Sequence, residues 1–336
     1  MVIIMKKTNQ RLTNGSNVVN LIRNWAAIFA VVLSIVIFSI ARPTTFLTYD
    51  NAITILRAVA ITAVLAMGLT VTLAVGGFDL GAGAMASVSG YFIMSYLLWY
   101  GWNFWLSLLL ALVMTFLLTG VTMFLIIKCK IPDLLATCAM MFILQGLGLT
   151  YTGGGAISAG MAQPNGEPAI GAIPEIMKDI SNSPMIMIGI MLVSVLLCHI
   201  FLNYTKYGRY IYATGGNKQA AKLSGIPVAR YRFIAGMISA FFIAVAALMV
   251  VSRNSSAQIQ GADGYQLPAL ASVFIGRSVL GMEKPNAAGT LVGALLLGIL
   301  DNGLIMVGIP YYVLPAIKGV VLALALFAAY ATSKED

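Results

Sequence analysis

Charged residues are scarce in this sequence. Asp, Glu, Lys and Arg together make up 9% of the 336 residues, whereas 60% are hydrophobic. A soluble domain of this length could not bury that much apolar surface, so the composition excludes a soluble enzyme and predicts an integral membrane protein. The net charge is +9. Because the basic residues fall in short loops between apolar runs, their role in membrane topology explains them, and nucleic acid is not expected as a partner.

Residues that usually carry enzyme chemistry are also few. One histidine, His199, and three cysteines, Cys129, Cys138 and Cys198, occur without the spacing of a metal site or a disulfide framework. The sequence contains no phosphate-binding Gly-x-x-x-x-Gly-Lys-Ser/Thr loop, nucleophile elbow or His-Glu-x-x-His helix. We therefore expect a protein that is not an enzyme and binds no cofactor itself. Any uphill transport would draw its energy from a partner or an ion gradient.

Long apolar runs dominate what is present. Their lengths, roughly 16 to 25 residues, suit helices that cross a bilayer. The run 265-280 is short and contains Pro268 and Gly276, so it is either a span or a re-entrant, broken helix. We expect an all-α, polytopic integral membrane protein with about ten transmembrane or re-entrant helices. The runs are 25-41, 52-75, 82-100, 103-127, 134-152, 184-203, 233-252, 265-280, 287-308 and 311-330.

A single transmembrane domain, residues 25-330, is expected between an N-terminal tail, 1-24, and a short C-terminal tail, 331-336. Most of the 20 Lys and Arg residues fall in these tails or in alternate loops. Basic residues mark the cytoplasmic side, so both termini are expected in the cytoplasm. The largest loop on the outer side, 153-183, either covers an opening or meets a partner, or is a floppy surface loop.

The longest polar stretch, residues 204-232, carries six basic residues and no acidic one. This charge places it in the cytoplasm. Asn217 is suited to an N-cap, residues 218-224 can form about two helical turns, and Gly225 supplies a stop. The pattern predicts a short helix held outside the bilayer.

Such a helix can dock into a groove on a soluble partner. Ala220, Ala221 and Leu223 provide small or apolar contacts between the lysines. The alternative is a solvated connector whose charges only fix the topology.

An unusual glycine-rich stretch follows the second run. Gly76 and Gly77 precede Asp79, and glycine can unwind a helix or bring two backbones together. Exposed backbone is tolerated at membrane depth only where protein or a water-filled cavity satisfies it, and a carboxylate there is costly. Asp79 is therefore a candidate for the translocation path or gate. The alternative is that Asp79 caps the next helix.

Three polar residues nearer the C-terminus are further candidates for the path. Asn254 lies in a polar stretch at the end of the run 233-252, and Asp301 and Asn302 lie inside the run 287-308. The last two either line a solute path or bond across a helix interface. Three glycines are expected at close helix contacts: Gly289, Gly293 and Gly298.

Two of these stretches resemble permease subunits of ABC importers of the ribose type, in the branched-chain amino acid and sugar permease superfamily. The cytoplasmic loop reads Gly215-Gly216-Asn217-x-x-Ala220-Ala221-x-Leu223-Ser224-Gly225-Ile226 and is similar to that family's coupling loop. The stretch Gly76-Gly77-Phe78-Asp79-Leu80-Gly81-Ala82-Gly83 is similar to the family's Gly-Gly-Ile-Asp-Leu-Ser-x-Gly. This chain departs from the usual pattern at Phe78, at Gly81 and at Gln266, where the family usually has Glu.

The resemblance implies a permease of the bacterial cell membrane that imports a monosaccharide or a related small polar solute. It implies a cytoplasmic ATPase subunit that uses ATP and Mg, an extracytoplasmic solute-binding protein, and a second permease copy. The residues expected to contact the ATPase are Gly216, Asn217, Lys218, Ala220, Ala221, Leu223, Ser224 and Gly225.

Other functions remain open at this point. An ion-coupled secondary transporter would use Asp79 or Asp301 as its coupling carboxylate. A membrane scaffold would bind a cytoplasmic partner without conducting a solute. An ABC importer for an autoinducer or a nucleoside would use a similar permease.

Overall fold

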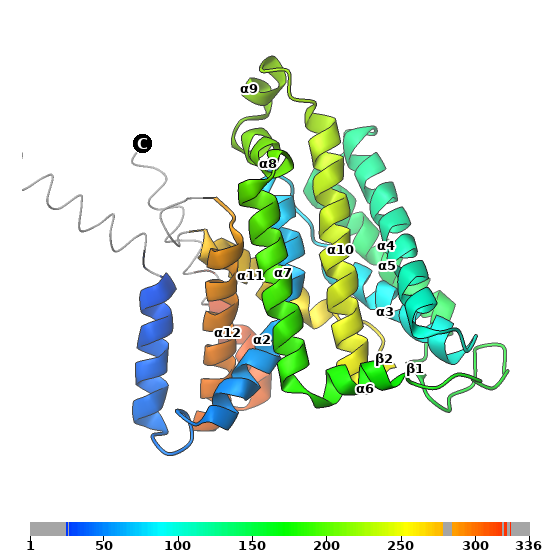
Figure 1. The fold of residues 1–336 in the computed structure, drawn as a ribbon, viewed down its shortest axis with the longest axis vertical. Helices are drawn as coiled ribbons and strands as arrows, with labels where there is room; N and C mark the ends of the chain where they lie inside the picture. Colours follow the sequence, from blue (N-terminus) through cyan, green and yellow to red (C-terminus); the bar gives the residue numbers. More distant parts are fainter. Residues whose placement is uncertain (1–24, 26, 278–283, 318, 321–322, 324–336) are drawn as a thin grey trace, which may run out of the picture.

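The computed structural model describes residues 25, 27–277, 284–317, 319–320 and 323. Both predicted tails and half of the run 311-330 lie outside this part. The helices stand side by side in a bundle, with α8 and α9 at one end and α6, β1 and β2 at the other (Figure 1). The elements are Ala27–Ala41, α2 (Tyr49–Ala74), α3 (Ala82–Leu98), α4 (Phe104–Ile127), α5 (Asp133–Thr152), β1 (Ile157–Ser158), α6 (Glu175–Asn182), α7 (Pro184–Tyr204), α8 (Lys206–Gly216), α9 (Lys218–Leu223), α10 (Val228–Asn254), β2 (Ser256–Ala257), the 3-10 turn Asp263–Tyr265, α11 (Gln266–Gly276), α12 (Ala287–Val307) and the 3-10 turn Tyr311–Val313.

The all-α prediction is confirmed. Among the described residues, six helices are long and apolar enough to cross a membrane, namely α2, α4, α5, α7, α10 and α12. The described residues contain a single strand pair, in which Ile157 faces Ala257 and Ser158 faces Ser256. The first nine predicted runs all contain a helix, and α10 begins five residues before the predicted 233.

Helix α11 is too short to cross a bilayer. Its 11 residues extend about 16 Å, roughly half of a hydrocarbon core. It follows a non-helical stretch that leads back into the bundle from the end of α10. Of the two predicted alternatives for the run 265-280, the described part fits a broken helix.

Side-chain caps begin several helices. The Thr48 side chain accepts a hydrogen bond from the backbone of Asn51 at the start of α2. Asn103 does the same for Leu106 in α4, at 2.8 Å. These side chains satisfy N–H groups that a helix leaves unpaired in its first turn.

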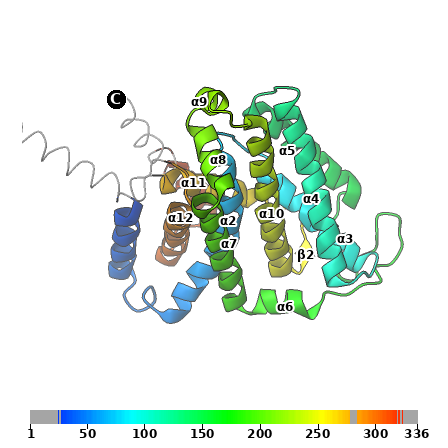
Figure 2. The ribbon, with the colours of Figure 1, turned by 45° about the horizontal axis from the view of Figure 1, so that its top comes forward.

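Helix α2 is the central helix of the bundle. It packs against α7, α10, α11 and α12, which surround it in both ribbon views (Figure 2). Its middle turns are almost completely buried, from Val59 to Leu69, and are rich in alanine. Because lipid tails are as apolar as these side chains, close packing rather than escape from water holds such helices together.

Glycines allow the closest contacts, as the sequence predicted. A Cβ on Gly276 would lie 2.3 Å from the backbone carbon of Gly289, so α11 and α12 touch backbone to backbone. A Cβ on Gly293 would lie 2.2 Å from the Ser272 carbonyl oxygen. Gly298 packs in the same way on the Val59 side chain of α2. The interpretation of Gly289, Gly293 and Gly298 as packing positions is confirmed.

The loop 153-183 is fastened to the bundle at several places. Ile157 is buried and pairs with Ala257. The backbone N–H of Gly171 donates to the Leu98 carbonyl at 2.8 Å. Helix α6 buries Met177 and Ile180 against the bundle. These contacts argue against a floppy surface loop.

Replacing Gly293 with alanine tests the packing of α11 on α12. The added methyl group meets a backbone oxygen that cannot move alone, so the helices must separate. We expect a destabilisation of about 1–3 kcal/mol, seen as a lower melting temperature of the detergent-purified protein. Gly189→Ala on α7 is the control, because its Cβ would meet no heavy atom within 4 Å. Equal melting temperatures for the two variants would contradict this packing.

Candidate functional site

The polar loop forms two helices rather than one. The predicted helix is α9, and Asn217 caps it by accepting hydrogen bonds from Gln219 and Ala220 at 3.0 and 2.9 Å. Gly225 ends it with a φ of +78°, as expected for a C′ glycine. Helix α8 was not predicted, because it is rich in tyrosine and ends in two glycines.

Helix α9 presents a mixed basic and apolar surface to solvent. Leu223 is 90% exposed, and Lys218, Ala220 and Lys222 are exposed as well. Ala221 differs from the expectation, because its side chain is 4% exposed and packs inward. A helix of six residues has one face on the protein and one in solvent, and Ala221 lies on the inner face.

Helix α8 touches the end of α2. Gly215 lies so close that a Cβ there would be 2.1 Å from the Ala74 carbonyl oxygen and 3.0 Å from the Gly76 nitrogen. The aliphatic part of Lys218 lies over Gly76. Helices α8 and α9 therefore rest directly on the junction between α2 and α3.

A second contact joins α8 to the start of α12. The Tyr212 hydroxyl donates to the Pro285 carbonyl at 2.8 Å, and the Lys284 ammonium lies 5.1 Å from the centre of its ring. Burial raises the pKa of Tyr212 to about 12, so its hydroxyl stays protonated and donates at neutral pH.

Residues 75-81 form a non-helical segment that leads from the end of α2 to the start of α3. Gly76 has a φ of +73°, which favours glycine. The Asp79 carboxylate accepts from the Gly81 N–H at 2.7 Å. The N-cap residue of α3 is Gly81, which has no side-chain cap, so Asp79 lies two residues before the N-cap and does not occupy the capping position predicted as its alternative. The Leu80 N–H donates to the Thr137 hydroxyl at 3.2 Å.

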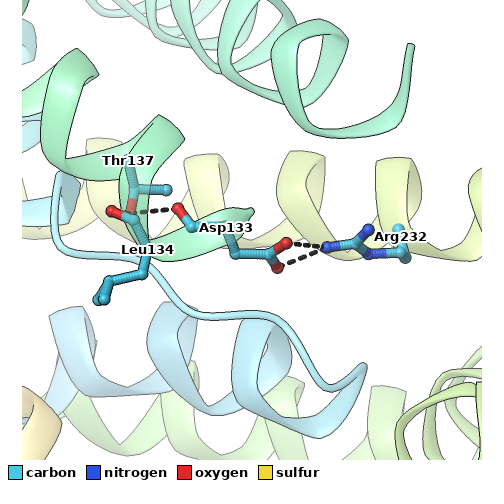
Figure 3. A network of polar contacts seen from close by, with 4 residues as sticks. All are labelled: Asp133, Leu134, Thr137 and Arg232. Carbon is cyan, nitrogen blue, oxygen red and sulfur yellow. Dashed lines mark hydrogen bonds and ion pairs between the residues drawn. The ribbon is translucent and has the colours of Figure 1, made fainter. Parts of the chain in front are cut away.

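An ion pair lies beside the segment 75-81. The Arg232 guanidinium of α10 donates to both carboxylate oxygens of Asp133, the first residue of α5 (Figure 3). The Thr137 hydroxyl donates back to the Asp133 carbonyl at 2.8 Å, and both residues belong to the first turns of α5 (Figure 3). Gly77 passes so close that a Cβ there would lie 3.1 Å from Asp133 Oδ2.

A narrow cavity lies beside Asp79. Its water-accessible volume is about 20 Å³, which suits one water molecule. The hydroxyls of Thr119 and Ser239 line it and are buried without a hydrogen-bond partner among the described residues. The remaining lining comes mainly from methionines and threonines of α3, α4 and α5. A solute larger than water does not fit in this cavity.

The starts of α3 and α11 meet inside the bundle. The Gln266 side chain accepts from the Gly83 N–H at 2.6 Å and donates to the Asp79 carbonyl at 2.9 Å. The Gln266 amide therefore pairs with a free N–H in the first turn of α3 and with a free carbonyl of the segment 75-81 before that helix.

Sequence reasoning missed a polar cluster next to this junction. Asp263 accepts from the Ser87 hydroxyl at 2.9 Å and from the Gln145 amide at 2.7 Å, near the middle of α5. An amide inside the apolar run 134-152 was the available signal. Among the described residues, no group of three or more His, Cys, Asp or Glu side chains is placed to hold a metal ion.

The other predicted path residues lie elsewhere. Asn254 is the exposed last residue of α10, at the end opposite α9. Asp301 and Asn302 are half-buried on α12, which packs mainly on α2, α7 and α11, whereas Asp79 lies against α5. The structure therefore brings Gly76, Gly77 and Asp79 together with α8 and α9 but leaves Asn254, Asp301 and Asn302 apart from them.

Comparison with known proteins identifies relatives along almost the whole chain. The family model described as the permease component of branched-chain amino acid transport systems matches residues 51–330. The chain is 32% identical to the ribose import permease protein RbsC of Escherichia coli K12, over 89% of this chain and 91% of the relative. It is 32% identical to the Bacillus subtilis ribose import permease protein, over 87% and 88% of the two chains.

A more distant relative is the xylose transport system permease protein XylH of Escherichia coli K12, which is 27% identical over 93% of this chain and 92% of its own. No solved structure matches the chain. Because the family model covers most of the sequence and the relatives align along most of their length, this protein belongs to the permease-component family of branched-chain amino acid transport systems.

Proposed function

We propose that this chain is the membrane permease of a bacterial ABC importer for a monosaccharide such as ribose or xylose, or for a related small polar solute. The observation that carries the proposal is its similarity to ribose import permeases from two bacteria, along nearly the full length of both chains. The apolar spans and the closed polar junction beside Asp79 suit a solute without net charge.

The chain would take its energy from a separate subunit. Its sequence has no phosphate-binding loop, so ATP and Mg would bind to a cytoplasmic ATPase. An extracytoplasmic solute-binding protein and a second permease copy would complete the importer. Of the predicted contact residues, all except the buried Ala221 are exposed and so accessible to that ATPase, with Leu223 as the exposed large apolar side chain.

The contacts of α8 suggest how the ATPase would act on the membrane part. A push on α9 reaches α8 through Asn217, and α8 rests on Ala74 and Gly76 without an intervening side chain. A shift of α8 would therefore move the segment 75-81 as a rigid contact. That segment holds Asp79 and leads to Gln266, so the same motion would change the junction between α3 and α11.

Uptake by reconstituted liposomes tests the proposed function. Liposomes would contain this chain with its co-purifying ATPase and binding protein, and uptake of labelled ribose, xylose and a nucleoside would be compared. We expect ATP-dependent uptake of a monosaccharide that persists when an ionophore removes ion gradients. Uptake without ATP that collapses with the ionophore would instead establish an ion-coupled transporter.

Gly215→Val tests the contact between α8 and the α2–α3 junction. The new side chain collides with the Ala74 carbonyl, so α8 must move away from it. We expect ATPase binding to remain and transport per ATP hydrolysed to fall about tenfold, corresponding to about 1.4 kcal/mol. Gly189→Val on α7 is the control, because a Cβ there would meet no heavy atom within 4 Å and the residue lies outside the predicted ATPase contact. Unchanged transport in Gly215→Val would rule out this contact as the coupling element.

Leu223→Asp tests the docking surface. Because Leu223 is 90% exposed, the substitution should leave the melting temperature unchanged. We expect the affinity for the ATPase, measured by titration in detergent, to fall at least about tenfold through loss of an apolar contact. Ile170→Asp, at a residue 74% exposed in the outer loop, is the control. Equal affinities for the two variants would place the ATPase elsewhere.

A further inference from the structure

An apolar groove lies on the outside of the bundle between α4 and α10. Its volume is about 530 Å³ and it is separate from the junction beside Asp79. No ionisable or hydrogen-bonding side chain contributes to its lining. The residues that line it are Val113, Phe116, Leu117, Gly120, Val121, Phe124, Phe233 and Met237.

The groove lies at the depth of the cytoplasmic leaflet. Helix α4 ends at Ile127, three residues after Phe124, and α10 begins at Val228, five residues before Phe233. At 1.5 Å per residue, these aromatic side chains are within about 8 Å of the helix ends that face the cytoplasm. The far end of the groove, at Val113, reaches toward the middle of the membrane.

Two basic residues stand above the groove on the helices that form it. Lys128 follows Phe124 by four residues and Arg230 precedes Phe233 by three, so each lies one turn beyond a groove residue on the same helix face. Both are exposed. Neither makes an ion pair with a residue that the structure describes, in contrast to Arg232, which binds Asp133. The arrangement is an apolar slot with two cationic groups at its cytoplasmic rim.

We propose that this groove binds one anionic phospholipid of the cytoplasmic leaflet. Its acyl chain lies along the groove over Gly120, and its phosphate group contacts Lys128 and Arg230. Basic residues at the membrane surface attract anionic lipid head groups, while the apolar slot selects against the solvated surface of a soluble partner.

Charge favours a lipid over a second copy of the chain. A second copy would have to offer carboxylates at the same depth to pair with Lys128 and Arg230. On the described part of the face that carries α8 and α9, the carboxylates are Asp79, which is half-buried and accepts from the Gly81 N–H, and Asp133, which is paired with Arg232. The described residues therefore leave no carboxylate on that face for this contact.

Lipid retention tests the proposal without any ATPase or solute. Protein would be extracted with mild detergent from vesicles of phosphatidylcholine and phosphatidylglycerol, and the retained lipids counted by mass spectrometry. We expect wild-type protein to be enriched in phosphatidylglycerol. The double variant K128Q/R230Q should lose this enrichment roughly tenfold, because two head-group contacts are removed.

Filling the groove provides the second arm. Gly120 has no heavy atom within 4 Å of its Cβ position, so Gly120→Leu occupies the groove without a clash within the protein. We expect it to release both lipids from the site. Gly146→Leu on α5 is the matched control, since Gly146 is equally open and exposed, and its lipid content should equal that of the wild type.

Three results would overturn the proposal. Wild-type protein could show no preference for phosphatidylglycerol, or Gly120→Leu could retain as much of it as Gly146→Leu. Native mass measurements could also show a dimer that Gly120→Leu, but not Gly146→Leu, converts to single chains, which would make the groove an interface between copies. None of these results depends on transport, so they leave the proposed import function untouched.

Discussion

A backbone N–H or carbonyl group inside a bilayer must find a partner within the protein, and the architecture of this chain follows from that requirement. Two segments interrupt the helices inside the bundle, one before α3 and one before α11. Side chains replace some of the missing helical bonds: Thr137 binds the Leu80 N–H, Tyr91 binds the Gln260 N–H, and Gln266 at the start of α11 binds the Asp79 carbonyl and the Gly83 N–H. Both broken segments are therefore tied to the neighbouring helices by side-chain hydrogen bonds.

Helices α8 and α9 are in direct contact with the segment 75-81 that leads to the polar junction. Gly215 brings α8 against the backbone at Ala74 and Gly76, and a backbone contact transmits displacement better than a flexible side chain does. The Asp133–Arg232 ion pair holds α5 and α10 on the far side of the same segment. The segment 75-81 thus lies between a surface accessible to a partner and the contact of two broken helices, which is where a transport cycle needs a movable element.

The sequence allowed the helices, the cap at Asn217, the stop at Gly225 and the packing glycines to be predicted, because each depends on local chemistry or on the length of an apolar run. It did not allow the Asp263, Gln145 and Ser87 cluster to be found, since these residues are far apart in the chain and only the fold brings them together. The inward direction of the Ala221 side chain could not be predicted either, because a helix of six residues is too short to show an apolar periodicity. Asp79 could be singled out from its glycine neighbours, but its hydrogen bond to the Gly81 N–H could be found only from the structure.

The Gln266 amide joins the start of α11 to the start of α3 without a titratable group. An amide donates from nitrogen and accepts at oxygen in the same protonation state, so its bonds to Asp79 and Gly83 do not depend on acidity. A glutamate, which is usual at this position in similar permeases, could make both bonds only when protonated. The two bonds that Gln266 makes between the starts of α3 and α11 therefore involve no titratable side chain at position 266.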